Sequence, residues 1–157
     1  MKGTLLRWIG IGWIVGWMAC ASYGKTPPDI RYGEDVCDAC HMVISESRFA
    51  AALTTPDGHV YLFDDIGCMV RFVQTQNVTI QNAWVHDYTT TIWTPVETAL
   101  FVRTRRVTTP MGYGVIAFAT PSAARTWQSA HDGPAFSWTR LRSMALSPQR
   151  LIQEDKQ

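Results

Sequence analysis

The chain has 157 residues, of which 46% are hydrophobic and 11% aromatic. This composition and length are typical of one folded domain, or of two small halves that share a core, and exclude disordered and fibrous proteins. Its 14 Lys and Arg residues and 13 Asp and Glu residues give a formal net charge of +1. So small a charge cannot hold nucleic acid or an anionic membrane by electrostatic attraction alone, and we expect no nucleic-acid partner.

Residues 1–19 have the pattern of a signal peptide. Lys2 and Arg7 precede an apolar run over residues 8–18, which is too short to span a bilayer. The sequence WMAC at residues 17–20 resembles a lipobox, so we expect cleavage before Cys20 and lipidation of Cys20. Simple secretion and an uncleaved anchor are the alternatives. The expected location is periplasmic, with a lipid anchor in a membrane, the outer membrane being favoured.

The rest of the chain divides into a tether, a domain and a tail. Residues 20–35 contain Pro27, Pro28 and two glycines among mixed charges, which predicts an extended tether. The domain is expected over residues 36–146. Residues 147–157 are polar and are predicted to form a flexible tail.

A five-residue segment occurs twice in the domain. TTPDG (residues 54–58) and TTPMG (residues 108–112) differ at one position, and an apolar run ending in Phe63 or Phe118 follows each. A helix-like pattern follows both runs. Strand-like segments precede the turns at residues 49–53 and 100–107, and another follows the first helix at residues 83–87. The sequence therefore predicts an α+β fold of two ββαβ repeats that share a core.

Polar residues mark the expected start of each helix. Asp64 or Asp65 is placed to cap the first helix, whereas Thr120 followed by Pro121 suits the start of the second. Capping explains the paired carboxylates without acid–base chemistry, and no pairing of a nucleophile with a base is evident, so we do not expect an enzyme. Cys68 falls in the first turn, where the helix dipole favours a thiolate, but away from the apolar stripe of that helix. It is interpreted mainly as a small packed residue, with a role as a metal ligand as the alternative.

Residues 37–42, CDACHM, place two thiols, an imidazole and a thioether close together. Once Cys20 is lipidated or removed, Cys37, Cys40 and Cys68 remain, and an odd number of thiols leaves at least one free, metal-bound or paired with another chain. A zinc site lacks a clear second ligand pair, and a thioredoxin-like site lacks a preceding strand. A structural disulfide between Cys37 and Cys40 is the simplest alternative.

Two metal chemistries also fit the segment. CDACH matches the C-x-x-C-H attachment motif of c-type haem, with His41 as the proximal ligand and Met111 as a possible distal one, although strands and hairpins are unlike small helical cytochromes. Alternatively, thiolate and thioether ligands select Cu(I), and Cys40, Met42 and Met111 offer such a set, with Cys37 or a histidine as further donors. Weakly bound thioethers suit a carrier.

These motifs together resemble the NosL family of accessory lipoproteins in nitrous oxide reductase maturation. The resemblance extends over roughly residues 30–141 and rests on residues 35–42, RFAA (48–51), FDDIGCM (63–69), VHDY (85–88) and PMG (110–112). It implies two ββαβ halves and a membrane-tethered periplasmic copper chaperone that binds Cu(I) and delivers it to a cuproenzyme, nitrous oxide reductase. By the same resemblance Cys40 and Met111 are copper ligands, and Met42 is a third donor.

One departure from the family pattern bears on the site. His41 stands where the family generally has glycine, which creates the haem-like motif and adds an imidazole. Two other functions therefore stay open: a haem-binding electron carrier that uses Cys37, Cys40 and His41, and a disulfide-stapled interaction module without metal. Among the remaining histidines only His86, beside the shared Asp87-Tyr88 segment, is a candidate ligand.

Overall fold

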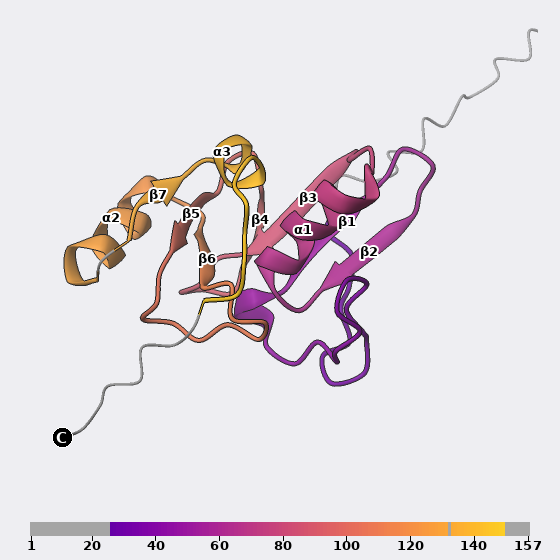
Figure 1. Cartoon of the computed structure of the whole chain (residues 1–157), viewed down its shortest axis with the longest axis horizontal. Coiled ribbons are helices and arrows are strands. Elements are labelled where there is room, and N and C mark those ends of the chain that lie inside the picture. Colours follow the sequence, from indigo (N-terminus) through magenta and orange to yellow (C-terminus); the bar gives the residue numbers. More distant parts are fainter. Residues whose placement is uncertain (1–25, 132, 150–157) are drawn as a thin grey trace, which may run out of the picture.

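The computed structural model describes residues 26–131 and 133–149, which form two antiparallel sheets, each with a helix packed against it (Figure 1). The first half contains the 3-10 turn η1 (Ser47–Phe49), β1 (Ala51–Thr54), β2 (Val60–Phe63), α1 (Ile66–Gln76), β3 (Asn82–His86) and β4 (Trp93–Pro95). The second half contains β5 (Leu100–Arg103), β6 (Val115–Phe118), α2 (Pro121–Ala130), β7 (Ala135–Phe136) and α3 (Trp138–Arg142).

The two halves have the same topology, which confirms the predicted repeat. The strand orders are β2-β1-β3-β4 and β6-β5-β7, so in each half the first strand lies between the second strand and the strand that follows the helix. The repeated pentapeptides also adopt the same turn. The N–H of Gly58 donates to the carbonyl of Thr55, and the N–H of Gly112 donates to that of Thr109, both at 2.9 Å. Both glycines have positive φ, 88° and 72°, which explains why glycine closes each pentapeptide.

The helix starts follow the sequence prediction. Asp65, not Asp64, is the N-cap of α1, and its side chain accepts a hydrogen bond from the N–H of Gly67. Thr120 caps α2 by accepting from the N–H of Ala123, and Pro121 occupies the first turn. Each cap satisfies one backbone donor that the helix cannot pair internally.

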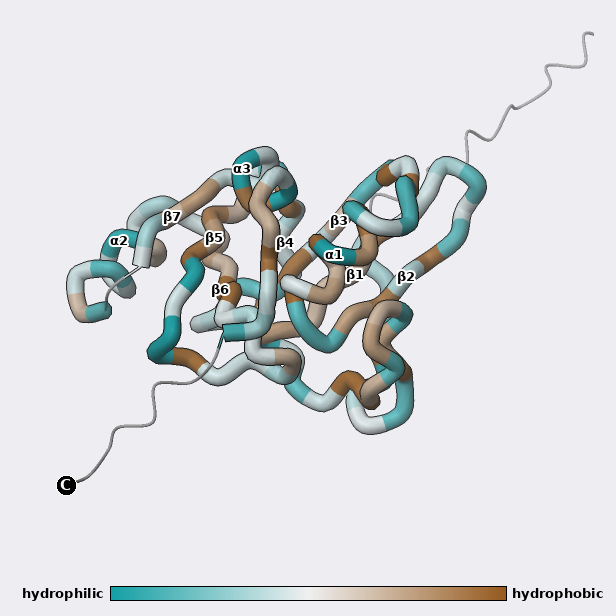
Figure 2. Tube along the Cα trace, in the orientation of Figure 1, coloured by the Kyte–Doolittle hydropathy of each residue, from teal (hydrophilic) through white to brown (hydrophobic). Residues whose placement is uncertain are grey.

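One core joins the halves. Successive side chains of β5 and β6 point to opposite faces of their sheet. One set enters the shared core and the other lies under α2. Those in the shared core are Phe101, Val115 and Ala117, and those under α2 are Val102, Ile116 and Phe118. Hydrophobic residues accordingly follow the strands in Figure 2, whereas the turn between β1 and β2 is hydrophilic.

Helix α1 approaches the second half closely at Gly67. A Cβ atom at this position would lie 2.1 Å from the ring of Tyr113, which follows the PMG segment in sequence. Only glycine therefore lets the start of α1 lie against this loop. This close approach fixes the position of the second half's loop relative to the first turn of α1.

Strand β5 is shorter than the predicted segment 100–107. It ends at Arg103, and the N–H of Thr104 donates to the carbonyl of Gly114, which closes a loop over residues 104–114. Gly114 has a φ of 65°, and a Cβ there would lie 2.2 Å from the Thr104 carbonyl oxygen. The loop carries the PMG segment away from the sheet and toward the first half.

Both ends of the expected domain extend beyond the predicted boundaries. In the segment assigned to the tether, Ile30 is buried and the hydroxyl of Tyr32 lies 2.8 Å from Nε2 of His86. In the segment assigned to the tail, the N–H of Gln149 donates to the carbonyl of Gly112 at 2.6 Å. The apolar Ile30 and Tyr32 explain why the chain packs before Val36.

The remaining predictions for the ends fall on residues that the structure does not describe. The signal peptide, Cys20 and the last eight residues lie outside the described part. Within residues 26–131 and 133–149, no helix is long and apolar enough to cross a membrane.

Candidate metal centre

The CDACHM segment forms a tight loop that turns two thiols toward α1. Val36 and Val43 pair across its base, and the N–H of Cys37 donates to the carbonyl of Met42 at 2.8 Å. At the tip, His41 adopts a φ of 62°, and its N–H donates to the carbonyl of Cys37 at 2.9 Å. The loop thereby buries Cys37 completely and leaves Cys40 partly exposed.

Four potential ligands converge where this loop meets the start of α1. One ligand atom from each of Cys37, Cys40, Asp64 and Cys68 lies within 4.8 Å of all the others. Asp64 comes directly after β2, and Cys68 lies in the first turn of α1. In an α-helix the Cα–Cβ bonds tilt toward the N-terminus, so the side chain of Cys68 leans toward the loop that precedes the helix. We call Cys37, Cys40 and Cys68 the thiol cluster.

Hydrogen bonds stabilise one thiolate in the thiol cluster. The thiol of Cys68 and the backbone N–H groups of Asp64, Cys40 and Ala39 all donate to the sulfur of Cys37. The Cys68 bond has the largest effect and lowers the pKa of Cys37 to about 7, although burial opposes the shift. Cys37 is therefore the thiol of the cluster that is most readily ionised at neutral pH.

The other two thiols hold their protons more strongly. Burial raises the pKa of Cys40 to about 12, and Cys40 Sγ donates to Oδ1 of Asp64 at 3.3 Å. The hydrogen bond to Cys37, together with burial, raises the pKa of Cys68. A bound cation would displace these protons, because thiols coordinate metals as thiolates.

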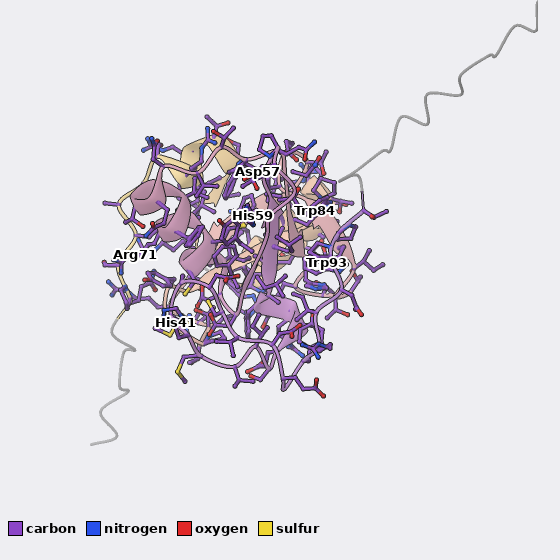
Figure 3. The ribbon with its side chains drawn as sticks, turned by 90° about the vertical axis from the view of Figure 1, so that its right-hand side faces the viewer. His41, Asp57, His59, Arg71, Trp84 and Trp93 are labelled. Atoms are coloured by element: carbon purple, nitrogen blue, oxygen red, sulfur yellow. The ribbon has the colours of Figure 1, made fainter. Side chains whose placement is uncertain are left out.

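A cavity of about 310 Å³ connects the thiol cluster to solvent. Cys40 and Cys68 form part of its wall on one side, and Met111 contributes from the PMG loop. The remaining wall comes from the loop and from the face of α1: Asp38, Ala39, His41, Arg71, Phe72, Thr75, Gln76 and Tyr113. Figure 3 shows sulfur atoms near His41, on the side of the molecule that also carries Arg71 and away from Trp84 and Trp93.

Asp65 connects Met111 to the first half. Its Oδ1 accepts from the N–H of Gly67 at 2.8 Å, and its Oδ2 accepts from the N–H of Met111 at 3.0 Å. The Thr109 side chain supplies a further hydrogen bond. The carboxylate is fully buried, and burial raises its pKa although these three hydrogen bonds oppose the shift. One carboxylate therefore caps α1 and also holds the PMG loop beside the thiols.

The residues predicted as metal ligands are distributed unequally around the site. Cys37 and Cys40 belong to the thiol cluster, and His41 and Met111 line the cavity. Met42, by contrast, is 58% exposed and does not line the cavity. The thioether of Met42 is therefore placed for contact with solvent or with another molecule.

Sequence reasoning gave Asp64 and Cys68 mainly structural roles. The structure shows that Asp64 does not cap α1 and that Cys68 faces the other thiols. The available signal was the position of Cys68 in the first helical turn, from which a side chain points back over the helix start. An apolar stripe on the helix indicates the buried face but gives no information about a cluster at its N-terminal end.

The other histidines of the described chain lie away from the thiol cluster. His86 is buried, stacks on Trp93 with ring centroids 3.7 Å apart, and has both ring nitrogens within hydrogen-bonding distance of Tyr32 and Thr91. His59 lies 3.5 Å from Asp57 in the turn between β1 and β2. His86 is therefore a structural residue of the core, and His59 is a surface residue of the turn.

Comparison with known proteins gives the family. The model of the family described as NosL matches residues 31–145. The chain belongs to the NosL family. Its fold is similar to a solved structure described as the copper chaperone NosL from Shewanella denitrificans, with a TM-score of 0.65 and 18% sequence identity, over 74% of this chain and 95% of that one. No curated protein sequence matches the chain.

The backbone conformation of His41 is one that favours glycine, the residue expected at this position from the resemblance. With a φ of 62°, this position lies in the left-handed region, which glycine adopts without strain and other residues adopt less readily. In this member of the NosL family the histidine accepts that conformation and places its imidazole at the cavity wall. The departure from the pattern therefore preserves the turn and adds a nitrogen donor.

Proposed function

We propose that this protein is an exported, lipid-anchored copper chaperone, which binds Cu(I) at Cys40, Met111 and Cys37 and delivers it for the assembly of nitrous oxide reductase. The observation that carries the proposal is the convergence of buried thiols and a cavity-lining methionine at one solvent-connected site. Membership of the NosL family supports it, as does the fold similarity to a protein described as a copper chaperone.

The donor set favours Cu(I) over harder divalent ions. Thiolates and thioethers are soft ligands, and the site combines both with few oxygen donors. The ion is the cargo of a carrier, so its oxidation state stays +1 and no substrate is chemically changed. Binding releases thiol protons to water as copper–sulfur bonds form.

The cavity gives the ion a route to a partner. Cys40, a member of the thiol cluster, lines the cavity together with Met111 and His41, and the exposed Met42 follows His41 on the same loop. A partner's ligands could replace the weaker thioether first and the Cys40 thiolate afterwards. Each step would form one bond to copper as another breaks, which keeps the ion coordinated throughout.

Anchoring through Cys20 would place this exchange near a membrane. The residues between Cys20 and the packed Ile30 would form the tether, which is shorter than residues 20–35 because Ile30 and Tyr32 contact the domain. A lipid anchor restricts diffusion to the membrane surface and so raises the effective concentration of the chaperone beside an acceptor there.

The burial of Cys37 argues against the haem alternative. Covalent attachment requires both cysteines of C-x-x-C-H to form thioethers with one porphyrin. Cys37 is fully buried, and its sulfur accepts hydrogen bonds from Cys68 and from three backbone N–H groups. A porphyrin could reach this sulfur only if the loop were rebuilt.

Met111 tests the proposed copper site. Met111→Ala is expected to weaken Cu(I) binding by about tenfold, because a neutral thioether contributes less than a thiolate. The affinity is measured anaerobically against a coloured Cu(I) chelator. Met111→Leu is the matched control: it preserves the volume but removes the sulfur, so it should weaken binding as much as alanine does. If the leucine variant bound like the wild type, Met111 would contribute only packing.

A further inference from the structure

We infer that Cys68 is a third thiolate ligand of copper, and that Cys37, Cys40 and Cys68 hold Cu(I) at the base of the cavity together with the Met111 thioether. This inference rests on the proposed function and defines where its cargo is bound. The resemblance to the family implies one cysteine and two methionines as copper ligands. The structure adds a buried thiol from α1 to the thiols of the CDACHM loop.

The positions of the three sulfurs carry the inference. They belong to a group whose ligand atoms all lie within 4.8 Å of one another, so one ion could contact all three after small shifts. Cys37 is fully buried and Cys68 is 3% exposed, whereas Cys40 is partly exposed. An ion bound to all three would therefore be shielded from solvent on two sides and accessible from the side of Cys40.

Backbone N–H groups prepare the loop sulfurs for this role. Cys37 Sγ accepts from the N–H of Ala39, two residues later, and Cys40 Sγ accepts from the N–H of Met42, also two residues later. Such bonds stabilise negative charge on sulfur and fix the direction in which its remaining lone pairs point. The loop thus presents both cysteines in the same local geometry, although only Cys37 is fully buried.

Packing alone does not account for the orientation of Cys68. The apolar stripe of α1 enters the shared core through Ile66, Met69 and Val70. Cys68 is buried in the same core, but its thiol also donates a hydrogen bond to Cys37 and borders the cavity. In this position Cys68 completes a set of sulfurs around a space that opens to Cys40 and Met111.

Asp64 has a different role in this arrangement. Its Oδ1 accepts from Cys40 Sγ at 3.3 Å. A carboxylate is a hard ligand, which Cu(I) does not favour, whereas Zn(II) binds thiolates and carboxylates alike in tetrahedral geometry. We therefore expect Asp64 to remain outside the Cu(I) coordination shell and to position Cys40.

The decisive experiment compares Cys68→Ser with the wild-type exported protein, both fully reduced and loaded anaerobically with Cu(I). Removing a residue that hydrogen-bonds to a metal ligand weakens metal binding by about 10- to 100-fold. Removing a direct ligand, as in Cys68→Ser, should therefore weaken Cu(I) binding by at least about 100-fold. Met69→Leu is the matched control, because Met69 is buried in the core in the same turn of α1 and does not line the cavity. The Cu(I) affinity of the Met69→Leu variant should equal that of the wild type.

X-ray absorption at the copper edge gives an independent count of ligands. Met111→Leu is used for this measurement so that every sulfur bound to copper is a thiolate, and three sulfurs are expected. A count of two sulfurs would overturn the inference. This measurement does not use Cys68→Ser, so it tests the inference even if circular dichroism shows that Cys68→Ser is unfolded.

The outcomes separate this inference from the proposed function. If the wild type bound no Cu(I), the proposed function itself would fail, and the inference with it. If the wild type bound Cu(I) and Cys68→Ser bound it within threefold as tightly, the three-thiolate site would be wrong while the chaperone proposal stood. A large loss in Cys68→Ser, with Met69→Leu unchanged, would support both.

Discussion

Cys40→Ser is expected to weaken Cu(I) binding by about a hundredfold, equivalent to about 2.7 kcal/mol, without unfolding the domain. Cys40 belongs to the thiol cluster and, like Cys68, borders the cavity, so its loss removes a ligand from every coordination step proposed above. It is also partly exposed, and its hydroxyl replacement can still donate to Asp64. The measurement is anaerobic competition with a Cu(I) chelator, together with thermal unfolding of the metal-free protein.

Ala39→Ser provides the control for this prediction. It adds a hydroxyl to the neighbouring exposed residue of the same loop and leaves all three thiols in place. Its Cu(I) affinity should match that of the wild type. Equal affinity in Cys40→Ser and Ala39→Ser would remove Cys40 from the site and with it the proposed route from the thiols to the cavity.

Asp65→Ala is expected to destabilise the protein by about 3 kcal/mol. The substitution removes the N-cap of α1, which is typically worth about 1 kcal/mol, and leaves the partly buried N–H of Met111 without its acceptor, at a further cost of about 1–3 kcal/mol. Urea unfolding of the metal-free protein measures the loss. Cu(I) affinity should also fall, since the PMG loop is no longer held at the start of α1.

Asp65→Asn separates the two roles of this carboxylate. The amide oxygen can still accept from Gly67, but the amide nitrogen would then face the Met111 N–H as a second donor. We expect the asparagine variant to retain the helix cap and to lose the connection to the loop. Wild-type stability in both variants would show that Asp65 does not join the two halves.

The repeat made most of the fold predictable. Two pentapeptides with the same turn chemistry, each followed by a strand and a capped helix, specify the order of four elements in each half. Strand β7 has two residues and α3 has five, which is too short for a hydrophobic period to develop, so neither was predicted. The early packing of Ile30 was also missed, because the prolines and glycines around it are typical of linkers.

Only some residues of the candidate site could be predicted from the sequence. The thiols of the CDACHM loop and the methionine of PMG stand out in sequence, because their residue types are rare and chemically distinctive. Asp64 and Cys68 join the loop thiols because the CDACHM loop lies against the start of α1, and the PMG loop reaches the same helix start through the close contact of Gly67 with Tyr113. A contact between residues distant in sequence leaves no periodic pattern in any one segment, so the sequence offered Cys68 only as an alternative ligand and the folded chain was needed to place it beside the other thiols.

Intact-mass spectrometry of the reduced exported protein, offered Cu(I) anaerobically, tests the copper proposal most directly. The host should be able to mature c-type cytochromes, so that haem attachment is also permitted. We predict one copper ion per chain under native conditions, which is lost when the protein is denatured. A haem mass that survives denaturation, or the absence of bound copper, would contradict the assignment as a Cu(I) carrier.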